Sequence, residues 1–329
     1  MTSKRIIVGI AAPARRFACG LLATLALLCG PWQAVRADVA LYQATVPLQG
    51  TTAADRNAAF GEALKMAAVR ASGRPEAATA PRVVAAAAQP EAYIQQYSTT
   101  ADRMLKVGFD GRAMEQLLQQ AGLPLWPAER PLTLVLLFVP GVADGARAVN
   151  ATEHPPERVE LERAALARGV PLAWPVESLD PAAARARLAG PGPVLTGLGS
   201  AGGYDWSFAH AGQSARTRGA LAAGADLAAD ALAARYAPAS TRSLGTVTVR
   251  IGGLADLAAY AALTVYLDGL SLVHAVTVRE LAGDTVQFDL EVRGDLELLR
   301  RIFALDSRLV AAPPAAPPAT NAPDFLWQP

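Results

Sequence analysis

Few side chains in this sequence combine the residue types and the spacing that catalysis or metal binding requires. The three histidines, His154, His210 and His274, fall in a predicted loop and in two separate predicted strands. None shares a predicted helix with a carboxylate or a second histidine one turn away, whereas a metal site needs three or four convergent ligands. The only cysteines, Cys19 and Cys29, lie close to the N-terminus. The sequence therefore predicts no catalytic residue, no metal site and no cofactor.

Two further motifs suggest chemistry but have structural explanations. Gly197–Gly203 has the glycine content of a phosphate-binding loop. The residues after it alternate like a strand, however, and a phosphate loop should open a helix. Asp289 and Glu291 form a carboxylate pair on the polar side of a predicted strand, where both would be solvated. Because the two carboxylates of a hydrolase need not be close in sequence, a hydrolase with an unrecognised carboxylate pair remains an alternative.

Aromatic side chains line one face of the predicted strand that follows this glycine-rich turn. These residues, the candidate ligand face, are Tyr204, Trp206, Phe208 and His210. Residues two apart in a strand point to the same side. Such a row either packs as an aromatic ladder or offers a flat ligand a surface on which to stack. The sequence alone leaves both interpretations open.

The C-terminal residues 309–329 are rich in proline and alanine, which predicts an extended and disordered tail. An apolar cluster, Phe325, Leu326 and Trp327, lies close to its end. An apolar cluster after a flexible linker is typical of a peptide that docks on a partner, so these three residues form a candidate docking peptide. The other interpretation is an adhesive tail without a specific partner.

The first 37 residues have the organisation of a secretory signal peptide. Basic residues, among them Lys4 and Arg5, precede an apolar segment, Phe17–Gly30, that is short for a membrane span. Val35 and Ala37 occupy the two cleavage positions, which predicts cleavage after Ala37. We therefore expect a periplasmic protein without cysteine or disulfide. An uncleaved membrane anchor is the rival interpretation.

The charge balance argues against a nucleic acid as the partner. The predicted leader holds five of the 30 lysines and arginines and no acidic residue, which leaves 25 basic against 29 acidic residues. Nucleic-acid binding normally requires a clustered basic excess. No stretch after the leader reaches the length of a membrane span. We expect the mature chain to bind no nucleic acid and to contain no membrane span.

The mature chain is predicted to be an α+β protein of three small α/β modules and a tail. The modules are residues 38–125 with the order β-α-α-β-α, residues 131–240 with the order β-α-β-α-β-β-α, and residues 244–308 with the ferredoxin-like order β-α-β-β-α. Stability must come from apolar burial, because the mature chain has no cysteine.

The first module rests on clear capping and alternation signals. Thr52 and Asp55 have the spacing of a capping box at the start of a helix. A second helical segment, interrupted near Pro90, is expected over residues 81–97. Apolar residues alternate over residues 103–109, as in a strand with one buried face, and Asp110 then caps a helix.

The middle and third modules are predicted from hydrophobic patterns in the same way. Leu132–Val139 is an unbroken apolar or neutral run, typical of a central strand that is buried on both faces. Asp180 and Pro181 predict the start of a helix, with aspartate as the cap and proline in the first turn. In the third module, residues 285–292 alternate strictly between apolar and polar side chains, and Asp295 caps a helix.

Several motifs resemble domain-of-unknown-function family 2066, an uncharacterised family of exported Gram-negative proteins. The main ones are AYIQQY (Ala92–Tyr97), VGFD (Val107–Asp110), LLQQAGLPLW (Leu117–Trp126) and RPLTLVLLFV (Arg130–Val139). The resemblance implies an exported protein with this domain order, and it implies no catalytic residue. More distantly, the first two modules look like envelope assembly accessories such as flagellar assembly protein T and the TolB amino-terminal domain, which is a likeness of fold only.

These observations favour a non-catalytic periplasmic protein that acts through its surfaces, as an interaction or accessory factor in cell-envelope assembly or maintenance. The first alternative is a periplasmic protein that binds a small ligand or glycan at the candidate ligand face. The second is the hydrolase with an unrecognised carboxylate pair.

Overall fold

The structure is a computed structural model that describes residues 36–38, 40–140, 146–176, 192–237, 244–313 and 322–328. Helices and three main sheets confirm the predicted α+β class. No helix in these ranges combines the length and apolar character needed to span a bilayer. Nearly all of the predicted signal peptide lies outside them. A short strand, β1 (Arg36–Asp38), pairs with β5 (Glu129–Pro131) and contains the predicted cleavage position after Ala37.

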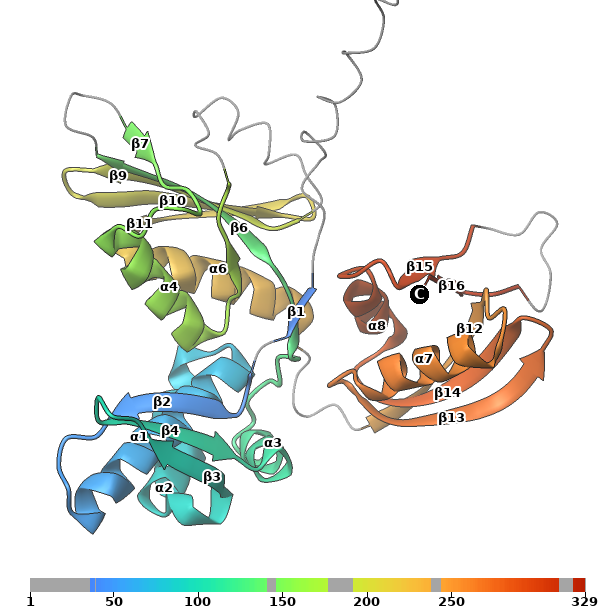
Figure 1. Cartoon of the computed structure of the whole chain (residues 1–329), viewed down its shortest axis with the longest axis horizontal. Coiled ribbons are helices and arrows are strands. Elements are labelled where there is room, and N and C mark those ends of the chain that lie inside the picture. The colour runs from blue at the N-terminus through green and yellow to red at the C-terminus, as the bar shows by residue number, and fades with distance from the viewer. Residues whose placement is uncertain are drawn as a thin grey trace, which may run out of the picture. The chain divides into compact units, whose positions relative to one another are not determined.

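The first domain is a three-stranded antiparallel sheet covered on one face by helices (Figure 1). Its strands, in the order β2-β4-β3, are Gln43–Pro47, Met104–Phe109 and Ile94–Thr99. Its helices are α1 (Ala53–Ser72), α2 (Pro81–Ala88) and α3 (Gly111–Gln120), with short 3-10 turns at Pro75–Thr79 and Pro90–Tyr93. The sheet and helices bury one apolar core, in which Leu64, Leu105 and Val107 are fully enclosed.

Local sequence signals fix the ends of these helices. The backbone N–H of Asp55 donates to Thr52 Oγ1 at 3.1 Å and Asp55 Oδ2 accepts from the Thr52 N–H at 3.0 Å, which confirms the predicted capping box. Helix α1 ends where Gly73 adopts φ 67°, a backbone conformation that favours glycine. Asp110 caps α3 through Oδ1, which accepts from the Ala113 N–H at 2.8 Å, as predicted.

The second predicted helical segment, residues 81–97, is wrong beyond Ala88. The helix is interrupted near Pro90, as predicted, but it does not resume, and Ile94–Thr99 forms strand β3 instead. The β3–β4 hairpin explains the difference, because pairing with β4 provides hydrogen bonds and a packing surface that local helix propensity does not. The observed order of this domain is therefore β-α-α-β-β-α.

Phe109 closes the core at the end of β4 and is 3% exposed. We predict that Phe109→Ala lowers the free energy of unfolding by about 3–5 kcal/mol, because truncating a buried aromatic side chain leaves a cavity. Urea unfolding measures the change. Lys106→Ala, on the exposed face of the same strand, is the control and should change stability by about 0.5 kcal/mol or less. A cost below about 1 kcal/mol for Phe109→Ala would contradict the observed core.

The middle domain is a sheet with the order β11-β10-β9-β6-β7 and with β8 also beside β6. Its strands are β6 (Thr133–Pro140), β7 (Ala146–Ala148), β8 (Leu172–Ala173), β9 (Val194–Ser200), β10 (Gly203–His210) and β11 (Gln213–Gly219). Helices α4 (Pro156–Arg168) and α6 (Leu221–Tyr236) cover one face (Figure 1). The helix predicted to start at Asp180 lies outside the described residues.

Strand β6 confirms the predicted central strand. Val135, Leu137 and Val139 belong to the apolar cluster that includes α4 and α6. Leu134, Leu136 and Phe138 alternate with them and form a second cluster on the opposite face. The unbroken apolar run is therefore explained by burial on both faces.

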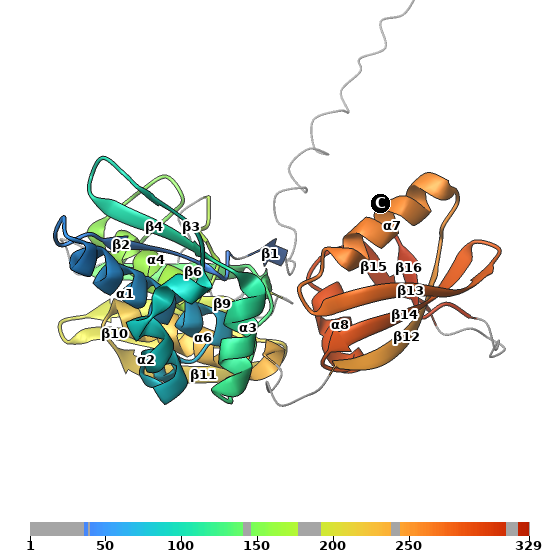
Figure 2. The ribbon, with the colours of Figure 1, turned by 90° about the horizontal axis from the view of Figure 1, so that it is seen from below.

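The third domain has a five-stranded sheet with the order β13-β14-β12-β16-β15, and Figure 2 shows β13, β14 and β12 side by side. The strands are β12 (Leu244–Gly252), β13 (Val273–Ala282), β14 (Thr285–Arg293), β15 (Leu309–Ala311) and β16 (Phe325–Trp327). Helices α7 (Leu257–Asp268) and α8 (Leu296–Phe303) pack on it. Because β14 lies between β12 and β13 and is antiparallel to both, the split β-α-β arrangement of a ferredoxin-like unit is present.

The end of this domain differs from the predicted boundary at residue 308. Strand β16 inserts between β12 and β15, and Ile251 pairs with Phe325 in parallel register. Phe325 is 3% and Trp327 is 5% exposed. The candidate docking peptide, Phe325, Leu326 and Trp327, is therefore a strand of the third domain. Burial of two large rings and backbone pairing on both sides explain the difference.

Candidate binding site

The candidate ligand face lies mostly against protein. Trp206, Phe208 and His210 are 2%, 3% and 8% exposed. The indole N–H of Trp206 donates to the Ala220 carbonyl at 3.1 Å, and its ring lies so close to Gly224 of α6 that a Cβ there would come within 2.5 Å of it. The structure thus brings these three side chains together under α6, where they pack as a ladder. Tyr204 alone is partly exposed.

His210 is held as a neutral side chain inside the middle domain. Its Nε2 lies 2.8 Å from the Tyr236 hydroxyl, and the two rings stack. Burial, and secondarily the positive charge of Arg235, lowers the pKa of His210 from 6.5 to about 4. The pair therefore contributes to the middle-domain core as a hydrogen-bonded, uncharged unit.

We predict that His210 makes the protein lose stability as the pH falls from 6.5 to about 4. The unfolded chain binds a proton at the ordinary histidine pKa, whereas the folded chain does not until a lower pH, so acidification favours the unfolded state. The loss should be about 1–2 kcal/mol after solvent screening. Urea unfolding over this pH range should show a smaller decline for His210→Phe than for the unmodified protein. Equal declines would contradict the buried neutral state.

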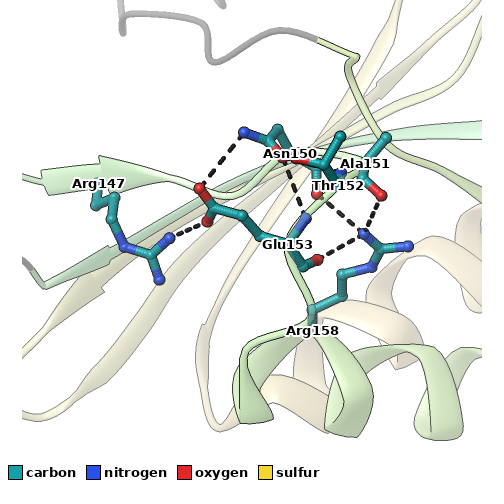
Figure 3. Close-up of polar contacts among 6 residues, drawn as sticks. All are labelled: Arg147, Asn150, Ala151, Thr152, Glu153 and Arg158. Carbon is teal, nitrogen blue, oxygen red and sulfur yellow. Dashed lines mark hydrogen bonds and ion pairs between the residues drawn. The ribbon is translucent and has the colours of Figure 1, made fainter.

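The polar side chains in the loop before α4 form hydrogen bonds and ion pairs with one another (Figure 3). The residues drawn are Arg147, Asn150, Ala151, Thr152, Glu153 and Arg158. Asn150 Oδ1 accepts hydrogen bonds from the Thr152 hydroxyl at 2.7 Å and from the Thr152 backbone N–H at 2.9 Å. The guanidinium of Arg158, which is 8% exposed, donates to three backbone carbonyls of this loop at 2.7–3.0 Å. Glu153 pairs with Arg147. The network holds the loop before α4.

Arg130 is fully buried between the first and middle domains. Its guanidinium donates to the carbonyls of Pro127, Gly169, Arg70 and Trp126 at 2.9, 2.6, 2.7 and 3.3 Å. It also lies over the Trp126 ring, 3.7 Å from the centroid. Burial, and then the charge of Arg70, lowers the pKa of Arg130 well below its usual range. The network gives Arg130 a structural role.

Two further arginines form hydrogen bonds between the first and middle domains. Arg70 of α1 donates to the Leu166 carbonyl in the last turn of α4 at 3.0 Å. Arg168 of α4 donates to the Gly73 carbonyl at the end of α1 at 3.1 Å and pairs with Asp226 and Asp230 of α6. The C-terminal ends of helices carry partial negative charge, which stabilises nearby cations. The arginines therefore join two helix ends and form no open site.

A pocket of about 620 Å³ in the first domain has a different character. It is lined by Ala53, Arg56, Asn57, Phe60, Glu91, Ile94, Gln95, Gln96 and Tyr97. We call this set of residues the β3 pocket. Helix α1 supplies its floor, and four consecutive residues of β3 and the amide side chains on it supply one wall. Hydrogen-bonding and aromatic groups therefore converge here.

Two groups in the β3 pocket are poised to bind. Asn57 Oδ1 is buried and accepts no hydrogen bond from any described residue. A buried acceptor without a donor costs about 1–3 kcal/mol, so such atoms usually meet a water or a ligand. Tyr97 is 54% exposed, and its ring stands edge-on to Phe60 at a centroid distance of 5.0 Å. An exposed ring beside an unpaired acceptor suits a ligand with both an apolar part and a hydrogen-bond donor.

The sequence alone did not predict the β3 pocket. Ala92–Tyr97 was only a motif of the family resemblance, and it was predicted to lie in a helical segment. The available signal was the run Ile94–Thr99, which has aromatic and β-branched residues after Pro90 and no charge. No group of three histidine, cysteine, aspartate or glutamate side chains in the described ranges is arranged to hold a metal.

Comparison with protein families places a match over the first domain. Residues 37–127 match a family described as a domain of unknown function (DUF8605). The resemblance to a family of unknown function is thus supported, although the matching family is not family 2066. All residues of the β3 pocket lie within the matched range. Comparison with curated proteins and with solved structures gave no match.

Proposed function

We propose that this protein is an exported, non-catalytic interaction protein that binds its partner through the β3 pocket and serves as an accessory factor in cell-envelope assembly or maintenance. The unpaired Asn57 Oδ1 beside the exposed Tyr97 ring carries the proposal. The lining side chains are mainly amide, aromatic and aliphatic groups, which bind and orient a partner. The leader and the motif resemblance to exported Gram-negative proteins support the location.

Export is tested by fractionation and by sequencing the N-terminus of the mature protein. The proposal expects release by osmotic shock and a chain that begins at Asp38. Recovery in the inner membrane with residues 1–37 retained would contradict it.

The unpaired acceptor gives a stability test of the β3 pocket. Asn57→Leu should raise the free energy of unfolding by about 1 kcal/mol, because it removes a buried unsatisfied atom and improves helix propensity. A binding residue is often retained at such a cost to stability. Asn150→Leu is the matched control and should destabilise by about 1–3 kcal/mol, since Asn150 Oδ1 accepts hydrogen bonds. Thermal and urea unfolding provide both values.

If Asn57→Leu destabilises the protein as much as Asn150→Leu, then Asn57 forms a structural hydrogen bond and the proposed site is wrong.

The proposal also expects the stabilised Asn57→Leu variant to lose its binding partner. Crosslinking in intact cells, followed by recovery of the tagged protein, compares the unmodified chain with Asn57→Leu and Tyr97→Ala. Tyr204→Ala, at the partly exposed end of the candidate ligand face, is the surface control.

The proposal expects one envelope protein to be crosslinked by the unmodified chain and by Tyr204→Ala, and to be lost from both β3-pocket variants. Retention of every crosslinked protein by Asn57→Leu and Tyr97→Ala would contradict it. A different outcome is that glycan fragments raise the melting temperature of the unmodified protein but not that of a variant at Tyr97 or at the candidate ligand face. In that case the alternative of a ligand-binding protein replaces the proposal.

A further inference from the structure

Strand β3 has an open edge along the β3 pocket. In the order β2-β4-β3 it pairs with β4 alone, and the described residues place no strand on its outer side. The Thr100 N–H donates to the Met104 carbonyl at 2.9 Å. Antiparallel pairs alternate between bonded and non-bonded positions, so Ser98 and Gln96 bond to β4. The backbone groups of Tyr97 and Thr99 therefore point outward, where they are free to pair.

Three other edge strands, β2, β11 and β13, carry features that oppose the addition of another strand. On β2, Arg70 donates to the outward Gln43 carbonyl at 2.5 Å, and Pro47 has no N–H. On β11, Arg216 and Arg218 are exposed charges. Strand β13 has two irregularities in its pairing with β14. Strand β3 has one irregularity in its pairing with β4, between Ile94 and Gln96, but its pairing is regular from Gln96 to Thr99 and it contains neither proline nor charge.

The β3 pocket lies where a side chain of an added strand would enter. Tyr97 is directly opposite Val107, which is fully buried beneath α1, so the Tyr97 side chain is on the helix-covered face. A residue of an added strand opposite Tyr97 would point to the same face. There it would meet the Phe60 ring and the unpaired Asn57 Oδ1.

We propose that the partner is an extended polypeptide segment that adds to the first-domain sheet as a fourth strand beside β3 and inserts one hydrogen-bond-donating side chain into the β3 pocket. This inference rests on the proposed function and names its partner class. Main-chain hydrogen bonds to Tyr97 and Thr99 supply affinity, and the pocket supplies specificity. Glutamine and asparagine have the required side-chain N–H donor for Asn57 Oδ1.

The probe is a blocked peptide of alternating threonine and valine with a central glutamine and terminal lysines. Fluorescence anisotropy should detect its binding to the full mature protein. A second peptide carries N-methyl groups on the valine amides, and a third on the threonine amides, so that each loses the donors of one edge. One methylated peptide should bind at least about tenfold more weakly than the other, because a strand pairs through one edge only. Equal binding of both would overturn the proposal.

The protein variant Thr99→Pro removes an N–H that points outward, so it should keep its melting temperature and bind the probe at least about tenfold more weakly. Ser98→Pro removes an N–H that bonds to β4 and should lower the melting temperature, which tests the strand alternation. Unchanged probe binding by a folded Thr99→Pro variant would overturn strand addition. So would the absence of binding by the unmodified protein at about 1 mM peptide.

The crosslinked partner separates this inference from the proposed function. Loss of the partner from Asn57→Leu, Tyr97→Ala and Thr99→Pro supports both. Loss from the first two with full retention by Thr99→Pro overturns strand addition and leaves the β3 pocket as a site for another part of the partner. Retention by all three contradicts both.

Discussion

Replacing Trp327 with alanine should lower the free energy of unfolding by about 3–5 kcal/mol, although only two residues follow it in the chain. Trp327 is 5% exposed, and its ring centroid lies 5.5 Å from that of Tyr266 on α7. Strand β16, which carries Trp327, lies between β12 and β15. The variant would leave a cavity under α7, and it should unfold at lower urea concentration.

Two further variants test the same burial of β16. Leu326→Ala changes the half-buried residue on the other face of β16 and should cost clearly less. Deletion of residues 324–329 removes the strand itself and should destabilise the third domain at least as much as Trp327→Ala. If the deletion leaves the melting temperature unchanged, the C-terminal residues are outside the core and the original hypothesis of a tail is restored.

Arg130→Met should cost about 3–5 kcal/mol, the second large effect that the structure predicts. The substitution keeps much of the apolar stem but leaves the carbonyls of Pro127, Gly169 and Arg70 without their donor inside the protein. Each buried carbonyl that loses its partner costs about 1–3 kcal/mol, partly offset by removing a buried charge.

Arg147→Met is the matched control for this substitution. Arg147 forms an ion pair with Glu153, and its side chain is 47% exposed, so the change should be about 1 kcal/mol or less. Urea unfolding of both variants, read with far-ultraviolet circular dichroism, provides the comparison. Equal effects would show that Arg130 does not hold the junction of the first and middle domains.

The elements that sequence predicted best are those whose signals are local. The capping box at Thr52 and the cap at Asp110 depend on side chains that bond to backbone a few residues away. The apolar run of β6 required only its own residues, because burial on both faces leaves no polar position in it.

The elements that sequence missed depend on contacts between distant residues. β16 is strand because it pairs with β12, more than 70 positions earlier, and its proline-rich approach predicted disorder. β11 has no large apolar residue and is fixed by its pairing with β10. Propensity is a weak guide when such pairing decides the structure.

The β3 pocket could not be predicted for the same reason. Asn57 and Tyr97 are 40 residues apart, and neither has a spacing or motif that indicates binding. The β3–β4 hairpin brings Tyr97 over α1, whereas the local sequence pattern predicts a helix at Tyr97. The candidate ligand face had a recognisable pattern, but the same pattern is produced by packing under a helix.

Amide hydrogen exchange at β3, resolved by residue, tests the open edge most directly. In the free protein the amides of Tyr97 and Thr99 should exchange rapidly, whereas that of Ser98, bonded to β4, should be protected. Saturation with the glutamine probe should slow exchange at Tyr97 and Thr99 and leave Ser98 unchanged. Protection of Tyr97 and Thr99 in the free protein, or rapid exchange at both when the probe is bound, would contradict strand addition at β3.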